Sequence, residues 1–258
     1  MLKEIIRNKR KEIEISKKSL PLERFRHGLK NSCRSFKDAL SKNKLNIIAE
    51  FKRKSPSQNY SGQKNTLIQS KRFFEIMKVY GEYADAISIL TDGKFFGGSL
   101  TDMENASNIA KLPVLRKDFI IDEYQIYESR LHNADAILLI ASQLPNRELN
   151  RFIKIAGDFG MDCLVEIHTE EELKRVLKSD AKVIGINNRE LGTLKVDLRT
   201  VLNLAVKVPK GRIIVAESGI SSRDYAEKIK GKVNAILVGS MLMNSENLEE
   251  TMKIFKEL

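Results

Sequence analysis

The sequence contains no tryptophan, only two cysteines and three histidines, and no long apolar run. Cys33 and Cys163 lie far apart and belong to no paired-cysteine motif, so we expect two reduced thiols. The histidines show no ligand-like spacing with cysteine, which argues against a metal site. No stretch reaches the roughly 18–20 apolar residues of a membrane span, and the charged N-terminus lacks the apolar core of an export signal. We therefore expect a cytoplasmic protein with no membrane partner.

Positive charge is concentrated at one end of the chain. The formal net charge is +11, and residues 1–44 contain 14 Lys/Arg against 5 Asp/Glu, so most of the excess lies there. This segment has no RNA-stacking aromatic motif and no zinc finger, so we predict no nucleic-acid partner. A solvated basic helix that also favours an anionic substrate explains the charge better. A basic binding protein built on a degenerate barrel is the non-enzyme alternative.

From about residue 45, short β-branched apolar runs alternate with helical stretches, a pattern typical of a parallel sheet. The predicted strands are 46–52, 85–91, 113–117, 135–141, 162–167, 182–187, 212–217 and 234–239. Apolar residues three and four positions apart predict helices at 67–82, 101–111, 122–133, 147–159, 169–179, 197–206, 222–230 and 246–257, with 101–111 the weakest pattern. Eight strands and eight helices predict an α/β protein with a single closed (β/α)8 TIM barrel at 45–258. An open doubly wound sheet is the alternative.

Residues 1–44 precede the first predicted strand and form an N-terminal extension. Their pattern predicts one or two extra helices followed by a basic connection. The first helix should end at Ser19-Leu20-Pro21-Leu22, because proline lacks the amide donor that a helix interior needs. No low-complexity linker separates this extension from the barrel, so we predict no second folded domain.

Charged and amide residues interrupt several predicted strands near their carboxyl ends. Side chains two apart share a face of a strand, and in a closed barrel the shared face here is the interior. Burying isolated charges there costs several kcal/mol each. A purely structural barrel would gain nothing from such charges. Because barrel active sites lie at the carboxyl ends of the strands, we predict catalytic groups at these positions. They are Glu50, Lys52, Lys117, Glu166, Asn187 and Glu217.

Glycine and serine follow the last two predicted strands, as Ser218-Gly219 and Gly239-Ser240. Late barrel loops commonly bind phosphate, because glycine lets backbone amides approach the oxygens and a short following helix adds its dipole. Ser55-Pro56-Ser57, directly after the first strand, could supply a third side together with Lys54. The sequence therefore predicts a phosphorylated small-molecule substrate.

Seven blocks in this order resemble the indole-3-glycerol phosphate synthase family of tryptophan biosynthesis. The resemblance covers about residues 46–243. Residues 1–44 also match the N-terminal extension of the family, which lies over the barrel mouth. The blocks are IIAEFKRKSPS (47–57), SILTDGKFFGGSL (88–100), PVLRKDFIIDEYQIYESR (113–130), LVEIHTEEEL (164–173), GINNRELGTLKVDL (185–198), VAESGI (215–220) and ILVGSMLM (236–243).

The resemblance implies a reaction and roles for particular residues. Such enzymes convert 1-(2-carboxyphenylamino)-1-deoxyribulose 5-phosphate into indole-3-glycerol phosphate, releasing CO2 and water, without metal or organic cofactor. By motif, Lys117 would be the general acid that protonates the ketone oxygen, and Glu166 would assist dehydration. Lys52 would position the substrate carboxylate and could share the role of general acid. The remaining strand-end residues, Glu50, Asn187 and Glu217, would hold the lysines and substrate hydroxyls.

The resemblance also places an aromatic end of the substrate against Phe96, Phe119 and Arg189. It implies no partner besides the substrate, and we expect a monomer that can associate weakly with other tryptophan-pathway enzymes. The sequence departs from the family pattern at 58–62, where the family usually has a lysine and glycine directly after SPS. The nearest enzyme alternative is another phosphate-binding barrel, such as a phosphoribosyl isomerase or a phosphosugar aldolase with a Schiff-base lysine.

Overall fold

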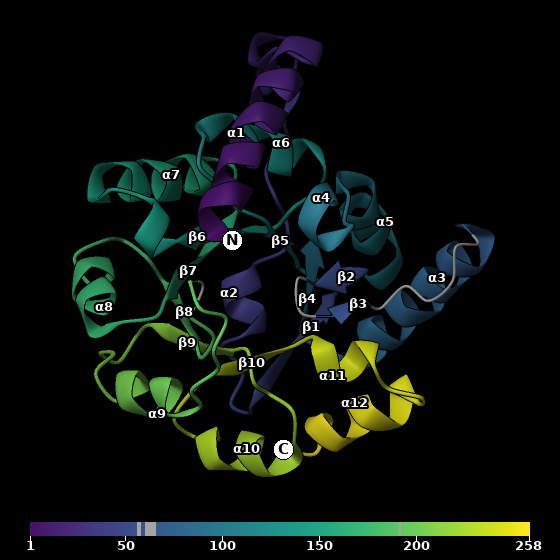
Figure 1. Ribbon diagram of the computed structural model, residues 1–258, viewed down its shortest axis with the longest axis vertical. Coiled ribbons are helices and arrows are strands. Elements are labelled where there is room, and N and C mark those ends of the chain that lie inside the picture. Colours follow the sequence, from purple (N-terminus) through teal and green to yellow (C-terminus); the bar gives the residue numbers. More distant parts are fainter. Residues whose placement is uncertain (56–57, 60–65, 191) are drawn as a thin grey trace.

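A closed barrel of eight parallel strands forms the centre of the computed structural model, which describes residues 1–55, 58–59, 66–190 and 192–258 (Figure 1). Neighbouring strands follow the chain order, and the last strand pairs with the first. The predicted closed barrel is confirmed and the open sheet is excluded. The strands are β1 (Asn46–Phe51), β4 (Ala86–Leu90), β5 (Val114–Lys117), β6 (Ala136–Ile140), β7 (Asp162–Ile167), β8 (Val183–Asn187), β9 (Ile213–Glu217) and β10 (Ala235–Val238).

Alternate side chains of each strand pack in two separate clusters. Ile47 and Ala49 belong to the layer between the strands and the outer helices. Ile48 belongs to the interior cluster, together with Leu115 and Leu164. The period of two therefore sorts the strand residues as the sequence predicts, and it directs the polar residues that follow Ile48, Leu115 and Leu164 into the barrel.

Each predicted helix of the barrel forms, including the weakest. α5 begins after Ser99, whose side chain accepts a hydrogen bond from the Asp102 amide at 3.0 Å. This cap gives the helix a defined start that its modest apolar pattern does not provide. The helices are α3 (Thr66–Tyr83), α5 (Leu100–Ala110), α6 (Glu123–Leu131), α7 (Asn146–Asp158), α8 (Glu170–Val176), α9 (Arg199–Ala205), α10 (Arg223–Ile229) and α12 (Leu248–Lys256).

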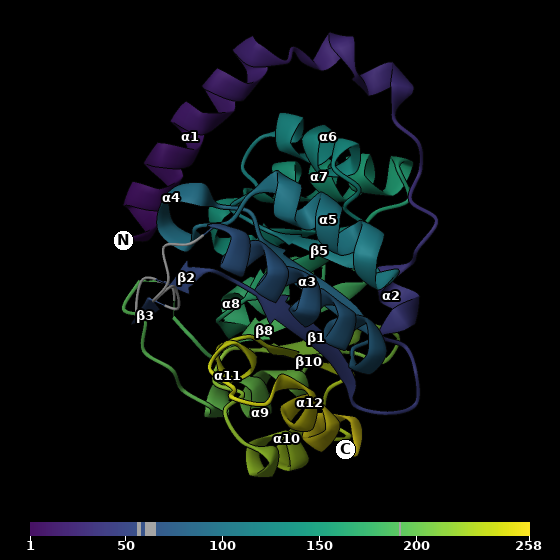
Figure 2. The ribbon, with the colours of Figure 1, turned by 90° about the vertical axis from the view of Figure 1, so that its right-hand side faces the viewer.

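The N-terminal segment runs from one end of the barrel to the other (Figure 2). α1 (Leu2–Ser19) lies on the side where β1 ends, and it stops two residues before Pro21. Two 3-10 turns, Leu22–Arg24 and Arg26–Gly28, lead to the short helix α2 (Phe36–Ala39) on the side where β1 begins. There Phe36 is fully buried in the interior cluster, and so is Leu40. This segment thus contributes apolar side chains at both ends of the barrel.

Short elements at the carboxyl ends have no periodic signal in the sequence, because none exceeds four residues. They are α4 (Gly93–Phe96), α11 (Ser240–Met243), the 3-10 turn Ala141–Gln143, and the antiparallel pair β2 (Lys54–Ser55) and β3 (Gln58–Asn59). In the part of the chain that the structure describes, no helix is long and apolar enough to cross a membrane.

Candidate active site

Lys117, the last residue of β5, places its ammonium between two carboxylates inside the barrel. Its Nζ is 2.9 Å from Glu166 Oε2 of β7 and 2.8 Å from Glu217 Oε2 of β9. Both glutamates are 1% exposed. Three separate strands therefore deliver an acid-base cluster to one point, at the end of the barrel where active sites lie.

A second lysine lies at the end of β1. Lys52 Nζ is 2.9 Å from Glu50 Oε1 and donates a hydrogen bond to Ser240 Oγ at 3.1 Å. Glu50 and Lys52 are two residues apart and so share the interior face. The hydrogen bond to Ser240 connects Lys52 to the start of α11, which follows β10.

Two glycines leave the space that the carboxylates occupy. A Cβ at Gly185 of β8 would lie 2.0 Å from Glu217 Oε1, and a Cβ at Gly239 would lie 2.3 Å from Glu50 Oε1. Such distances are far below van der Waals contact. Each glycine therefore leaves room for the glutamate beside it.

The charges of the cluster depend on one another. Burial disfavours the ammonium of Lys117, but Glu166 and Glu217 outweigh burial and hold the pKa of Lys117 above its usual range. Burial raises the pKa of Glu217 to about 7; Lys117 opposes this rise and Glu166 reinforces it. Burial also disfavours ionised Glu166, yet Lys117 and His168 together keep the pKa of Glu166 below its ordinary value. The site thus keeps a charged lysine beside a carboxyl group that titrates near neutral pH.

Backbone turns border a polar cavity beside the lysines. Its lining includes Ser218, Gly219, Gly239, Ser240 and Lys52. Ser218 and Gly219 both have positive φ, at 60° and 74°, and the Asn188 side chain donates to the Ser218 carbonyl at 3.0 Å. The loops after β9 and β10 thus line one cavity together with Lys52.

One residue of the predicted phosphate side, Lys54, does not line this cavity. Lys54 Nζ donates to the carbonyl oxygen of Lys94 at 2.6 Å. The sequence gives no sign of this, because α4, which carries Lys94, has no periodic pattern. Ser55 is placed in β2, and its side chain lies outside the described residues, as do Ser57 and most of the atypical segment 58–62.

Apolar side chains form the other wall of the site. The rings of Phe96 and Phe119 lie 6.2 Å apart between centroids, and Arg189 lines the same cavity. Arg189 donates through Nη1 to the carbonyl of Leu194 at 3.1 Å. The structure therefore brings Phe96, Phe119 and Arg189 together with Lys52, Lys117 and Asn187 around one cavity.

Several residues that line this cavity are not predicted as site residues from the sequence. Met1, Leu2 and Ile5 of the N-terminal segment, with Leu138 and Ile140 of β6, complete the apolar wall. The β6 pair follows the same two-residue alternation, but apolar residues do not stand out in an apolar strand.

His168 is a polar residue that the sequence interpretation missed. Its Nε2 lies 3.4 Å from Glu166 Oε1, and its Nδ1 lies 3.5 Å from Glu172 Oε2. Burial lowers the affinity of His168 for a proton, but Glu172 and Glu166 outweigh burial and raise the pKa of His168. Its position two residues after Glu166 was the available signal. Among the described residues, no group of three or more His, Cys, Asp or Glu side chains is arranged to hold a metal ion.

Solved structures of other proteins share the fold. KGPDC from Streptococcus mutans is similar with a TM-score of 0.62 at 15% identity, covering 83% of this chain and 97% of that chain. The 3-hexulose-6-phosphate synthase from Salmonella typhimurium has a TM-score of 0.64 at 14% identity, with 83% and 97% covered. The closed barrel and the polar cluster at its carboxyl end define the class: a (β/α)8-barrel enzyme.

The sequence comparisons identify the family within that class. The family model for indole-3-glycerol phosphate synthase matches residues 2–255. The synthase of Bacteroides thetaiotaomicron is 39% identical over 259 residues, covering 99% of this chain and 97% of that protein, and that of Endomicrobium trichonymphae is 44% identical over 225 residues, covering 86% and 85%. The chain belongs to the indole-3-glycerol phosphate synthase family, the carboxy-lyases of tryptophan biosynthesis that convert 1-(2-carboxyphenylamino)-1-deoxyribulose 5-phosphate into indole-3-glycerol phosphate.

Proposed function

We propose that Lys117 is the general acid of the ring closure. As the aromatic carbon that bears the carboxylate attacks the ketone carbon, negative charge develops on the ketone oxygen. An ammonium at that oxygen neutralises this charge and then donates its proton, an effect worth roughly 10²–10⁴-fold in rate. The observation that carries the proposal is the position of Lys117 Nζ, within 3 Å of two buried carboxylates at the barrel mouth. These carboxylates keep the ammonium charged and aimed.

Loss of CO2 then restores the aromatic ring, and departure of the new hydroxyl as water forms the indole. We assign Glu166 to this dehydration, as the group that transfers a proton between substrate and leaving hydroxyl. Its Oε2 is held by Lys117, while its Oε1 faces His168. In this assignment Glu217, which pairs with Lys117, supports the lysine, and Asn187, which lines the same cavity as Glu166, supports the substrate hydroxyls.

The two ends of the substrate suit the two walls of the site. We assign the phosphate to the turns at Ser218-Gly219 and Gly239-Ser240, which line the polar cavity and can present backbone amides to an anion. The anthranilate ring fits the wall of Phe96 and Phe119, and the cations Lys52 and Arg189 are placed for its carboxylate. No metal or organic cofactor enters this scheme.

The assignment of Glu166 is tested by Glu166→Gln. This change keeps the shape of the side chain but removes its proton transfer, so dehydration should slow by about 10²-fold or more while substrate affinity changes little. Rapid quenching should then show the decarboxylated, hydroxylated intermediate accumulating ahead of product. Wild-type product formation in this variant would remove Glu166 from the dehydration step.

A Schiff-base mechanism, as in an aldolase, would use the same kind of lysine differently. Borohydride treatment with substrate distinguishes the two. A general acid leaves no adduct, whereas a covalent adduct on Lys117 or Lys52 would contradict the proposed mechanism.

We further propose that the enzyme is a cytoplasmic monomer that associates weakly with other tryptophan-pathway enzymes. A tryptophan biosynthesis protein named TrpCF from Buchnera aphidicola is 40% identical over 252 residues, and this chain covers 54% of its length. What supports the association is that a relative of this chain occurs within a longer protein of the same pathway. Sedimentation of the purified enzyme, alone and mixed with those enzymes, tests this proposal.

A further inference from the structure

Lys9 is a buried lysine in a helix whose sequence is mostly charged. It is 4% exposed, and its Nζ lies 2.9 Å from Asp118 Oδ1, 3.1 Å from Asp92 Oδ2 and 2.7 Å from Glu12 Oε2. Burial disfavours its charge, yet Asp118 and Asp92 outweigh burial and hold the pKa of Lys9 above its usual range. A charge in such a place is tolerated only because these partners are fixed around it.

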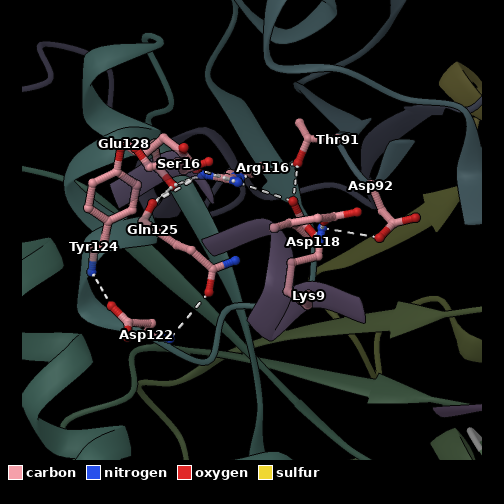
Figure 3. A network of polar contacts seen from close by, with 12 residues as sticks. Lys9, Ser16, Thr91, Asp92, Arg116, Asp118, Asp122, Tyr124, Gln125 and Glu128 are labelled. Carbon is pink, nitrogen blue, oxygen red and sulfur yellow. Dashed lines mark hydrogen bonds and ion pairs between the residues drawn. The ribbon is translucent and has the colours of Figure 1, made fainter. Parts of the chain in front are cut away.

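Asp118 connects Lys9 to the catalytic strand end. It directly follows Lys117, and Figure 3 shows it between Lys9 and Arg116. Its Oδ2 accepts hydrogen bonds from Thr91 Oγ1 at 2.6 Å and Arg116 Nη2 at 3.1 Å, and its Oδ1 accepts the Phe119 amide at 2.8 Å. The same carboxylate that receives Lys9 therefore orients the backbone on which Phe119 follows Lys117.

Asp92 makes the corresponding connection on the neighbouring strand end. It is fully buried, and its Oδ1 accepts the Phe95 amide at 2.7 Å as the N-cap of α4. α4 carries Phe96, which lines the apolar wall of the cavity. Lys9 thus touches the two carboxylates that organise both aromatic residues of that wall.

The first turns of α1 complete the wall from outside. Met1, Leu2 and Ile5 line the cavity, and Lys9 stands one helical turn after Ile5 on the same face. We propose that Lys9 is a positioning residue, which fastens the first turns of α1 to Asp118 and Asp92 so that this apolar wall closes over the bound substrate. This inference rests on the proposed assignment of the wall to the anthranilate ring.

The other end of α1 offers a matched control. Lys17 Nζ pairs with Asp122 Oδ2 at 2.7 Å, but these side chains are 38% and 30% exposed. Solvent screens such a pair, and pairs of this kind contribute little. Lys17→Met removes the same charge from the same helix without leaving a buried carboxylate unpaired.

The experiment compares Lys9→Met with Lys17→Met by hydrogen exchange of the free enzyme and by steady-state kinetics. Lys9→Met should speed exchange of the α1 amides at least about tenfold while the barrel strands keep their protection. KM for the carboxyphenylamino substrate should rise at least about tenfold, with a smaller change in kcat. Lys9→Arg, which restores the charge, should recover most of the affinity, and Lys17→Met should resemble the wild type.

A second variant guards against poor folding of Lys9→Met. Asp92→Asn keeps the N-cap of α4 and leaves Lys9 paired with Asp118 and Glu12, so it should give smaller changes in the same direction. The proposal is overturned if α1 exchange does not change, if it rises equally in α1 and the strands, or if KM moves no more than in Lys17→Met. The exchange result stands even if the catalytic assignments fail, so the two failures can be told apart.

Discussion

At the scale of single residues, the shared ammonium of Lys117 determines the behaviour of the site. Glu166 and Glu217 both approach this lysine. Burial raises the pKa of Glu217 to about 7, whereas the pKa of Glu166 stays below its ordinary value. Sequence alternation places these residues on one face, but it cannot decide which carboxylate keeps its charge. That depends on distances and on His168, whose partners lie in two elements.

The raised pKa of Glu217 makes stability fall with pH in a defined window. The unfolded chain ionises this carboxyl near 4.5, whereas the folded enzyme holds the proton until about 7. Between these values the native state binds more protons, so the free energy of unfolding decreases as pH rises. The pKa of His168 is also raised, so its protonation adds a further decrease in the free energy of unfolding as pH rises above 6.5.

Urea unfolding at pH 5 and pH 7.5 measures this effect. The wild type should lose on the order of 1–3 kcal/mol over the interval more than Glu217→Gln does, because the variant has no proton to release there. Equal pH dependence in the two proteins would show that Glu217 titrates normally in the folded state.

At the scale of elements, the alternation of side chains along each strand predicts most of the residues that point into the barrel. It places Glu50, Lys117 and Glu166 in the barrel because each strand is regular and buried on both faces. It fails for residues whose position depends on short elements. Phe36 belongs to a four-residue helix, and Lys9 lies in a charged helix whose pattern indicates solvent. Tertiary partners alone, Asp92 and Asp118, decide that Lys9 is buried.

The glycine after β10 gives a prediction at this scale. Gly239→Ala should displace Glu50 from Lys52, because the new methyl group would lie 2.3 Å from Glu50 Oε1. We expect turnover to fall at least about tenfold, with the circular-dichroism spectrum unchanged. Gly157→Ala in α7, where nothing lies within 4 Å of the added Cβ, is the control. It should keep full activity and gain up to about 1 kcal/mol of stability. Full activity in Gly239→Ala would show that the Glu50–Lys52 pair tolerates displacement.

At the scale of the whole molecule, one chain segment contacts both ends of the barrel. α2 buries Phe36 at the amino ends of the strands, while α1 brings Met1, Leu2 and Ile5 to the carboxyl ends (Figure 2). Part of the basic segment 1–44 therefore lies beside the cavity at the carboxyl ends, where positive charge would favour approach of a substrate that carries both a phosphate and a carboxylate. Composition indicated the charge, but the division of the segment between two ends required the structure.

We propose that the cluster around Lys117 closes the indole ring. The most direct measurement follows indole fluorescence during turnover of 1-(2-carboxyphenylamino)-1-deoxyribulose 5-phosphate by the wild type and by Lys117→Ala. The enzyme contains no tryptophan, so no indole of its own contributes to the signal. We predict a steady rise for the wild type and a rate at least about 10²-fold lower for the folded variant. A near-wild-type rate in Lys117→Ala would contradict the account.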